Sequence, residues 1–379
     1  MSYNILFPLI TSFLSAGVVT LVGLPYIIKA CRYFEYFDIP DERKVHRKPV
    51  PRLGGLIFMP AAAVGLIVAS WTCVMTGGKE FMFGVSTIAM TLGGLMIYIV
   101  GVIDDRYGMK AAQKFVIQTV SAFIMPLCNL VITDLNGLFG LHQIPFAVAY
   151  VLTVIAILTI VNAINLIDGI DGLSSGLCIL ILFAYMIVLR GNLAIASLDA
   201  AIVGSLVVFW FFNVFGKVGG LKIFMGDAGS LFLGYVCAYM SIKSLMRPIA
   251  PVDCGEEQML ISITLLLVPV LDVIRVALQR RFTGHGIFEP DKTHIHHILM
   301  NAGLSMHAAL ACILSLFLLI CGINYAMWQC HFLMPFIVLT DIAIYVLIWG
   351  VLMLSQTNRA TDSFAKKFNP VPRTLNGGS

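Results

Sequence analysis

The sequence predicts an all-α integral membrane protein, a polytopic bundle of about 11 transmembrane helices. Of its 379 residues, 59% are apolar and only 12% are charged, whereas a soluble domain carries roughly 25% charge. Uncharged runs recur at about the 20-residue length that crosses a bilayer. The net charge of +4 is small and scattered, which excludes a nucleic-acid-binding footprint and leaves the lipid bilayer as the expected environment.

The expected spans follow one another along the chain. They cover residues 5–28, 53–76, 81–103, 115–133, 144–161, 173–189, 200–216, 228–242, 258–271, 308–328 and 332–358. No charge precedes Lys29, so the N-terminus lacks the basic start of a removable signal peptide and the first helix is expected to stay. Residues 1–358 should form a single transmembrane catalytic domain, and residues 359–379 a polar, disordered cytoplasmic tail.

The distribution of Lys and Arg predicts the orientation of the bundle. With the N-terminus outside and the C-terminus inside, only Lys79, Arg190, Lys243 and Arg247 of the 24 basic residues face outward. Positive charge gathers in cytoplasmic loops, so the N-terminus is expected outside and the basic connections on the cytoplasmic side. The outer loop from Thr133 to Pro145 contains an Asn-Gly turn signal and predicts a small hairpin.

Five polar stretches combine carboxylates with glycine, histidine or lysine, and this topology places all of them on the inner side. They are residues 38–55, 104–114, 162–176, 216–230 and 290–297. The inner connections are therefore expected to carry the chemistry.

Asp104 and Asp105 end the third span. A solvated helix end is the simple interpretation. However, carboxylates at a helix C-terminus oppose its dipole, and at the edge of the membrane they are costly unless a cation neutralises them. The pair therefore predicts a divalent metal or a lysine partner.

The stretch after the fifth span places two carboxylates in a glycine-rich turn. Asp168 and Asp171 each precede a glycine, which allows both side chains to converge on one ligand. An Asx turn followed by a serine cap is the alternative. Asn162 and Asn165 lie one helical turn apart on the preceding span and add two amides that are expected to bind substrate.

The segment Gly226 to Ser230 begins the eighth span. Free N–H groups at a helix start suit an anion, while Asp227 suits Mg²⁺; simple capping by Asp227 is the alternative. Phe224 either packs in the core or stacks on a base.

Three histidines, His294, His296 and His297, form an H-x-H-H pattern that lacks the i, i+4 spacing of a helical zinc motif. The other inner stretches are rich in oxygen ligands, which favour Mg²⁺ over zinc. We expect these histidines to hydrogen-bond phosphate or hydroxyl groups, with zinc ligation and a structural role as alternatives. Asp272, at the end of the ninth span, is expected to be structural.

A basic run extends from Arg43 to Arg52 and includes His46 and Lys48. It either sets the topology and attracts anionic lipid or forms an anion pocket. Together, the five stretches predict a Mg²⁺-assembled phosphoryl site at the cytoplasmic lipid surface. One reactant would be a soluble nucleotide, and the other an amphiphile whose phosphate lies at that surface.

Five ordered motifs resemble those of the polyprenyl-phosphate N-acetylhexosamine-1-phosphate transferases. They are D-x-P…K-x-H…P-x-P-R-x-G-G from Asp38, the Asp104–Asp105 pair, N-x-x-N-L-x-D-G-x-D-G-L, F-M-G-D-A-G-S and P-D-x-x-H-I-H-H. The resemblance implies attack by undecaprenyl phosphate on the β-phosphorus of a UDP-sugar, with release of UMP. It also implies Mg²⁺, which Mn²⁺ can replace, as cofactor. A homodimer is an open alternative to a monomer.

Site roles follow from the same resemblance. Asp227 and Asp104 resemble metal ligands, and Asp104 with Asp105 resembles the pair that orients or deprotonates the lipid phosphate. The implied catalytic residues are Asp104, Asp105, Asp168, Asp171, His294, His296 and His297. The implied substrate-binding residues are Asp38, His46, Lys48, Arg52, Lys114, Asn162, Asn165, Asn213, Phe224 and Gly226. The family's DDxxK lysine is not kept, which leaves Lys110 and Lys114 as the candidates for that cation.

Two branches of this family are relevant. One transfers N-acetylglucosamine-1-phosphate to start a surface glycan, and the other transfers phospho-N-acetylmuramoyl-pentapeptide in peptidoglycan synthesis. The muramoyl branch has three consecutive histidines, whereas this chain has H-I-H-H and a longer loop between Asn213 and Asp227. Both features favour the glucosaminyl branch. The rivals from other classes are an ion-coupled transporter, which would place its carboxylates near mid-span, and an intramembrane metallopeptidase.

Overall fold

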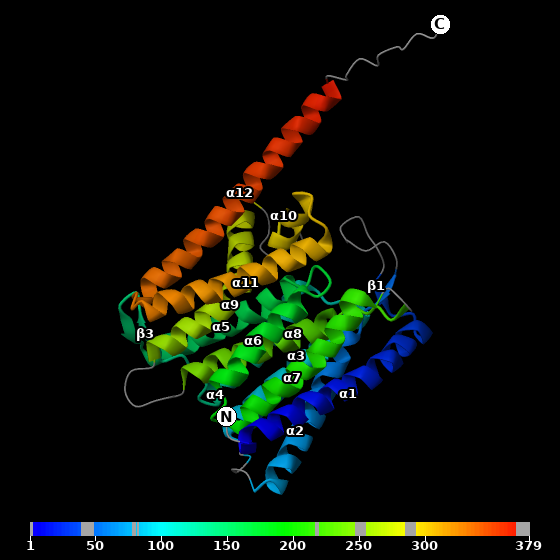
Figure 1. The fold of residues 1–379 in the computed structure, drawn as a ribbon, viewed down its shortest axis with the longest axis vertical. Coiled ribbons are helices and arrows are strands. Elements are labelled where there is room, and N and C mark those ends of the chain that lie inside the picture. The colour runs from blue at the N-terminus through cyan, green and yellow to red at the C-terminus, as the bar shows by residue number, and fades with distance from the viewer. Residues whose placement is uncertain are drawn as a thin grey trace.

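The chain is helical over most of its length. The computed structural model describes residues 3–38, 49–77, 81, 83–216, 220–246, 255–284 and 293–368. Its elements, drawn in Figure 1, are α1 (Tyr3–Tyr33), β1 (Phe37–Asp38), β2 (Val50–Pro51), a 3₁₀ turn (Gly54–Ile57), α2 (Phe58–Met75), α3 (Val85–Tyr107), α4 (Ala111–Leu127), β3 (Asp134–Leu138), β4 (Leu141–Gln143), α5 (Phe146–Leu166), α6 (Leu173–Val188), α7 (Leu193–Phe215), α8 (Gly226–Leu245), α9 (Gly255–Phe282), α10 (Ile295–Asn301), α11 (Met306–Gln329) and α12 (Met334–Phe368).

Eight helices in the described part of the chain are long and apolar enough to cross a membrane. They are α1, α2 with its 3₁₀ turn, α3, α5, α7, α9, α11 and the first part of α12. Each of the predicted apolar runs overlaps a helix, but α4, α6 and α8 do not meet these criteria. A multi-pass, all-helical membrane protein is thus confirmed, while the count of eleven spans stays a prediction.

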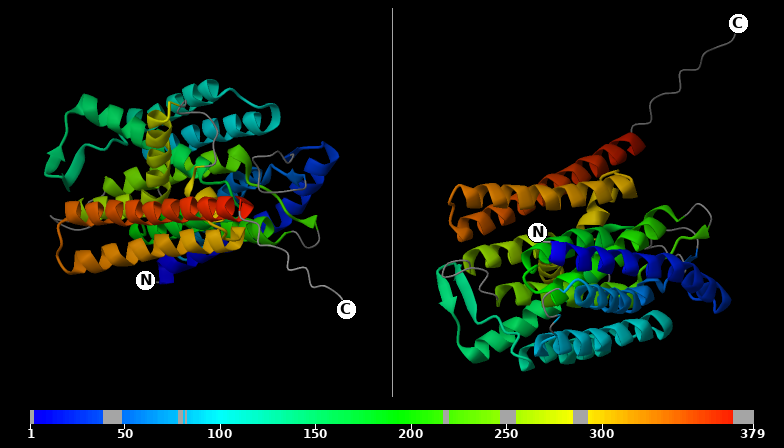
Figure 2. Two further views of the ribbon diagram at one scale, coloured as in Figure 1. Left: turned by 90° about the horizontal axis from the view of Figure 1, so that it is seen from above. Right: turned by 60° about the horizontal axis from the view of Figure 1, so that its bottom comes forward.

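Two short pairs of strands lie at opposite ends of the bundle (Figure 1), and Figure 2 shows β3 and β4 at one of these ends. Strands β3 and β4 pair antiparallel, with Leu138 opposite Leu141, which confirms the hairpin predicted for residues 133–145. At the other end β1 pairs with β2. Helix α12 continues to Phe368, past the predicted boundary at residue 358. Residues 369–379 of the predicted tail lie outside the described residues.

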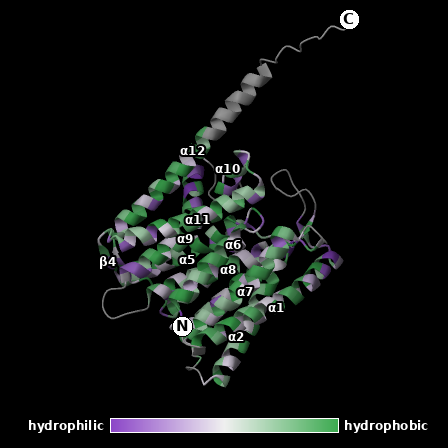
Figure 3. Ribbon diagram, in the orientation of Figure 1, coloured by the Kyte–Doolittle hydropathy of each residue, from purple (hydrophilic) through white to green (hydrophobic). Residues whose placement is uncertain are grey.

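Helix α8 is the centre of the bundle. Its residues from Ala228 to Ile242 are buried, and it packs mainly on α3 and α5, whereas α1 packs on α7 and α2. Small residues permit a close contact: a Cβ added at Gly101 of α3 would lie 2.4 Å from the Cα of Ala228. Apolar residues dominate the helices, while polar residues gather at helix ends, around β1 and α10 among others (Figure 3). The C-terminal end of α3 is therefore held against the N-terminal end of α8.

Candidate active site

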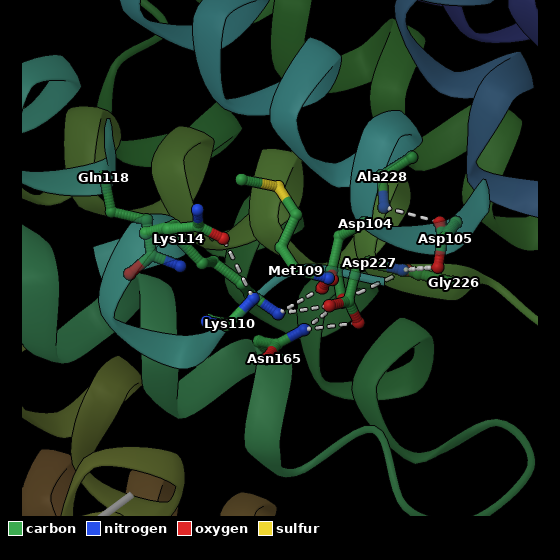
Figure 4. A network of polar contacts seen from close by, with 12 residues as sticks. Asp104, Asp105, Met109, Lys110, Lys114, Gln118, Asn165, Gly226, Asp227 and Ala228 are labelled. Atoms are coloured by element: carbon green, nitrogen blue, oxygen red, sulfur yellow. Dashed lines mark hydrogen bonds and ion pairs between the residues drawn. The ribbon is translucent and has the colours of Figure 1, made fainter. Parts of the chain in front are cut away.

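Asp105 caps helix α8 from the neighbouring helix α3. Its fully buried carboxylate accepts hydrogen bonds from the backbone N–H groups of Asp227, at 2.9 Å, and Ala228, at 3.0 Å (Figure 4). Arg52 forms an ion pair with the same carboxylate, with its Nε 2.9 Å from Asp105 Oδ1. Gly226 has a φ of 74°, and a Cβ there would lie 2.5 Å from Asp105 Oδ2, so only glycine fits. These contacts fix the position of the adjacent Asp227 side chain.

Asp104 and Asp227 share one cation, the ammonium group of Lys114. Lys114 Nζ lies 2.9 Å from Asp104 Oδ2 and forms a second ion pair with Asp227, and Figure 4 shows the lysine between the two carboxylates. Burial by itself lowers the pKa of Lys114, but the negative charges of Asp227 and Asp104 outweigh it and raise that pKa. The predicted lysine partner is thus present. Lys114, rather than Lys110, supplies it.

Asn165 completes this cluster from the end of α5. Its Nδ2 donates to Asp227 Oδ1 at 3.2 Å and to Ser230 Oγ at 2.8 Å. Asn162, one turn earlier, instead donates to Gln118 Oε1 at 3.1 Å and to the Leu158 carbonyl at 2.8 Å. The two amides, which were expected to have the same role, therefore have different partners. Asn165 reaches the carboxylates, whereas Asn162 ties α5 to α4.

A cavity of about 1030 Å³ opens beside these carboxylates. The predicted site residues that line it are Asp38, Arg52, Asn165, Asp168, Asp171, Asn213, Phe224, Gly226, Asp227 and His297. Within the described residues, the side chain of Asp168 forms no hydrogen bond or ion pair. Burial, followed by the charges of Asp227 and Asp171, raises the pKa of Asp168 to about 8. Asp168 is thus a carboxyl group open to a ligand beside a second acidic side chain.

The cavity lining also carries a cation that was not predicted from the sequence. Lys222 forms an ion pair with Asp171, and its ammonium lies 5.4 Å from the centre of the Phe224 ring. Asn213 joins the two loops involved: it accepts from the Gly172 N–H at 2.6 Å and donates to the Ile223 carbonyl at 2.9 Å. The available signal was the position of Lys222, two residues before Phe224 in a loop already noted as unusual.

The three histidines approach the cavity from the segment that starts α10. His297 lines the cavity, whereas His294 and His296 are 5% and 1% exposed. A Cβ added at Gly169 would lie 2.1 Å from His296 Nε2, so this glycine allows the imidazole to pack directly on the Asp168–Gly172 loop. Burial, followed by the charges of His297 and His294, lowers the pKa of His296 to about 3.

Asp38, at the end of β1, is a further predicted residue that reaches the cavity. Asp38 lies 3.9 Å from Arg52 Nη1 at the cavity wall. His46 and Lys48 belong to residues 39–48, which lie outside the described residues.

The donor set of this site fits Mg²⁺. Among the described residues, no three His, Cys, Asp or Glu side chains form a complete metal cage. Mg²⁺ needs none, because it usually binds through one or two carboxylates together with substrate phosphates and water. Asp104 and Asp227 already hold a positive group between them in the form of the Lys114 ammonium. These two carboxylates are therefore suited to a cation.

Comparison with known proteins agrees with this geometry. The sequence profile of glycosyl transferase family 4 matches residues 87–245, which contain both acidic motifs of the cluster. A probable undecaprenyl-phosphate N-acetylglucosaminyl 1-phosphate transferase of Bacillus subtilis (strain 168) is 30% identical over 300 residues, 78% of each chain.

Two further relatives carry similar names. An undecaprenyl-phosphate alpha-N-acetylglucosaminyl 1-phosphate transferase of Escherichia coli (strain K12) is 25% identical over 350 residues, 90% of this chain and 89% of the relative. A decaprenyl-phosphate N-acetylglucosaminephosphotransferase of Mycolicibacterium smegmatis is 28% identical over 316 residues, 78% and 76% of the two chains. The chain therefore belongs to glycosyl transferase family 4, among the polyprenyl-phosphate N-acetylhexosamine-1-phosphate transferases, and is a multi-pass membrane enzyme.

Proposed function

We propose that this enzyme transfers N-acetylglucosamine-1-phosphate from UDP-N-acetylglucosamine to undecaprenyl phosphate and releases UMP, as the first step of a lipid-linked surface glycan. The observation that carries the proposal is the convergence of Asp168, Asp227 and Lys222 on one cavity at the end of an apolar bundle. Such a place is open both to a lipid-borne phosphate and to a water-borne nucleotide. The names of the relatives support the N-acetylglucosamine branch over the muramoyl branch.

The reaction joins two phosphates. An oxygen of the lipid phosphate forms a bond to the β-phosphorus of the UDP-sugar, and the bond from that phosphorus to the bridging oxygen breaks, so that UMP leaves with the electron pair. A phosphate monoester with a second pKa near 6 is already mostly dianionic at neutral pH. The acidic residues therefore contribute by placing charge and cations rather than by removing a proton.

The side chains of the cavity divide the binding tasks. Phe224 offers a ring for the uracil to stack on. Arg52 and Lys222 supply positive charge for the pyrophosphate, and the amide of Asn165 holds Asp227 in place. Mg²⁺ would be held by Asp227 and Asp104. When bound, it would neutralise the negative charge on the phosphate oxygens. Mn²⁺ has similar ligand preferences and should substitute.

The orientation of the bundle belongs to the same proposal. Twenty of the 24 Lys and Arg residues fall on the side of the acidic cluster when the N-terminus is outside. This bias favours a site that faces the cytoplasm in the inner membrane, where the nucleotide-sugar is available.

A donor panel tests this function. Purified protein is incubated with undecaprenyl phosphate, Mg²⁺ and one of several UDP-sugars, and the release of UMP and the formation of lipid-linked product are measured. We expect turnover with UDP-N-acetylglucosamine. Turnover only with UDP-N-acetylmuramoyl-pentapeptide would assign the muramoyl branch instead, and no lipid-linked product with any donor would contradict the proposal.

A further inference from the structure

A second buried carboxylate, that of Asp272, contacts residues 294–297, which we call the histidine segment. Asp272 of α9 is 1% exposed, and its two oxygens accept four hydrogen bonds. These come from His294 Nδ1 at 2.7 Å, the Ile295 N–H at 3.0 Å, Arg275 Nη2 at 2.8 Å and the Tyr345 hydroxyl at 3.0 Å. The four donors belong to α9, α10 with the residue before it, and α12. One side chain therefore joins three separate helical segments.

Arg275 strengthens the same junction. Besides Asp272, its Nη2 donates to the Thr293 carbonyl at 2.5 Å, and its Nη1 donates to Gln279 Oε1 at 3.1 Å. The backbone on both sides of His294 is thus held, at the carbonyl before it and at the N–H after it. A carboxylate only accepts hydrogen bonds, so the hydrogen of a neutral His294 lies on Nδ1 and its Nε2 is left as the acceptor.

The fixed segment continues into the cavity. The rings of His294 and His296 are stacked at 5.9 Å with an interplanar angle of 7°, and those of His296 and His297 lie 4.3 Å apart. His296 packs against Gly169, next to the open carboxyl of Asp168, and His297 lines the cavity. A displacement of His294 would therefore also move His296, which packs on the Asp168–Gly172 loop, and His297, which lines the cavity.

We infer that Asp272 is a positioning residue for the reaction, rather than a purely structural one: its carboxylate places the His294–His297 segment against the Asp168–Gly172 loop and so sets the width of the donor cavity. This inference rests on the proposed function for its link to the donor. The placement itself rests only on the contacts described above.

The test compares two buried aspartates changed in the same way. Asp272→Asn keeps the shape of the side chain, but its amide group brings N–H donors to face the donors around it. Asp341→Asn is the matched control, because Asp341 of α12 is also fully buried and accepts from Asn324 Nδ2 at 2.7 Å, in a contact that does not involve the histidine segment. Steady-state rates are measured against the concentration of UDP-N-acetylglucosamine. A separate experiment without substrate measures histidine modification by diethyl pyrocarbonate with mass spectrometry, with exposed His331 as internal reference.

We expect Asp272→Asn to raise the KM for the donor about tenfold or more, and to lower kcat less, because a small misplacement of binding groups has effects of this size. Modification of His294 and His296 should rise several-fold relative to His331. Asp341→Asn should change neither measurement. Unchanged KM and unchanged labelling in Asp272→Asn, or equal changes in Asp341→Asn, would overturn the inference.

A milder variant covers the case in which Asp272→Asn does not fold. Tyr345→Phe removes one of the four donors, so a shift in the same direction of about threefold, the size of one hydrogen bond, is expected in KM and in labelling. No shift in either would overturn the inference. If the wild-type protein turns over no UDP-sugar, the proposed function fails, whereas the labelling of Asp272→Asn still decides whether this residue positions the histidines.

Discussion

Two groups of carboxylates at the same end of the bundle differ in how completely their oxygens are used. Asp105 and Asp272 are fully buried. Asp105 accepts two hydrogen bonds from backbone N–H groups and pairs with Arg52, and Asp272 accepts four hydrogen bonds. The carboxyl group of Asp168 has no hydrogen-bond or ion-pair partner among the described residues. Asp104 and Asp227 share the ammonium of Lys114, and each also accepts one hydrogen bond, from the Met109 N–H and from Asn165 Nδ2 respectively. The saturated carboxylates hold segments in place, whereas the open ones are available to a cation or a substrate.

The largest effect should come from an open carboxylate. Asp227→Asn removes a negative charge beside the cavity, and we expect Mg²⁺-dependent release of UMP to fall at least about a hundredfold, the scale of losing one electrostatic contact in a transition state. The circular dichroism spectrum should be unchanged, because the helix cap comes from Asp105. Normal turnover in this variant would show that Asp227 does not serve the reaction.

The adjacent pair Asp104 and Asp105 offers the sharpest test of the difference between open and saturated groups. Asp105→Ala removes the cap of α8 and takes from Arg52 its nearest acidic partner, so the free energy of unfolding should fall by about 2 kcal/mol. Asp104→Ala should lose activity with little loss of stability. Thermal unfolding and UMP release are measured on both variants, and equal stability losses would contradict the division.

Because Gly101 lies at the close contact between α3 and α8, its substitution should cost more stability than that of another glycine on the same helix. Gly101→Ala places a Cβ 2.4 Å from the Cα of Ala228, so overpacking should lower the free energy of unfolding by about 1 to 3 kcal/mol. Activity should fall as well, because this contact sets the distance between Asp104 and Asp227. Gly94→Ala on the same helix is the control, since its added Cβ meets Phe232 at an ordinary 3.5 Å. A similar loss in both variants would assign the effect to glycine itself.

The smallest effect concerns pH and His296. Its pKa is about 3 in the folded protein, so below about pH 6.5, the ordinary histidine pKa, the unfolded chain binds a proton that the folded chain does not. Stability is therefore lost as the pH falls, by about 1.4 kcal/mol between about pH 7.5 and about pH 5.5. His296→Gln should flatten the thermal-unfolding profile over that range. A variant with the wild-type slope would show that another group is responsible.

The sequence predicted the helical membrane fold and the acidic rim because both depend on local pattern. Apolar runs mark helices in lipid, and Asp104 and Asp227 stand out because charge at a membrane edge is costly. The different tasks of Asp104 and Asp105 were not predictable, since successive side chains on a helix point about 100° apart and only the packing shows which one meets α8.

Contacts between residues that are distant in the sequence were also not predictable. Lys222 and Asp171 are 51 positions apart, and Tyr345 is 73 positions from Asp272. Neither pairing can be predicted from the spacing of neighbouring residues. Lys222 was therefore not predicted as a site residue, and Asp272 was predicted to be structural.

We expect the open carboxylates, and not the saturated ones, to hold a divalent cation. Electron paramagnetic resonance of Mn²⁺, titrated with protein in nanodiscs in the presence of UDP, measures this binding without turnover. We predict that the wild type and Asp272→Asn bind one tight Mn²⁺ per chain and that Asp227→Asn loses that site. Equal binding by Asp227→Asn and the wild type, or loss of binding in Asp272→Asn alone, would contradict the account.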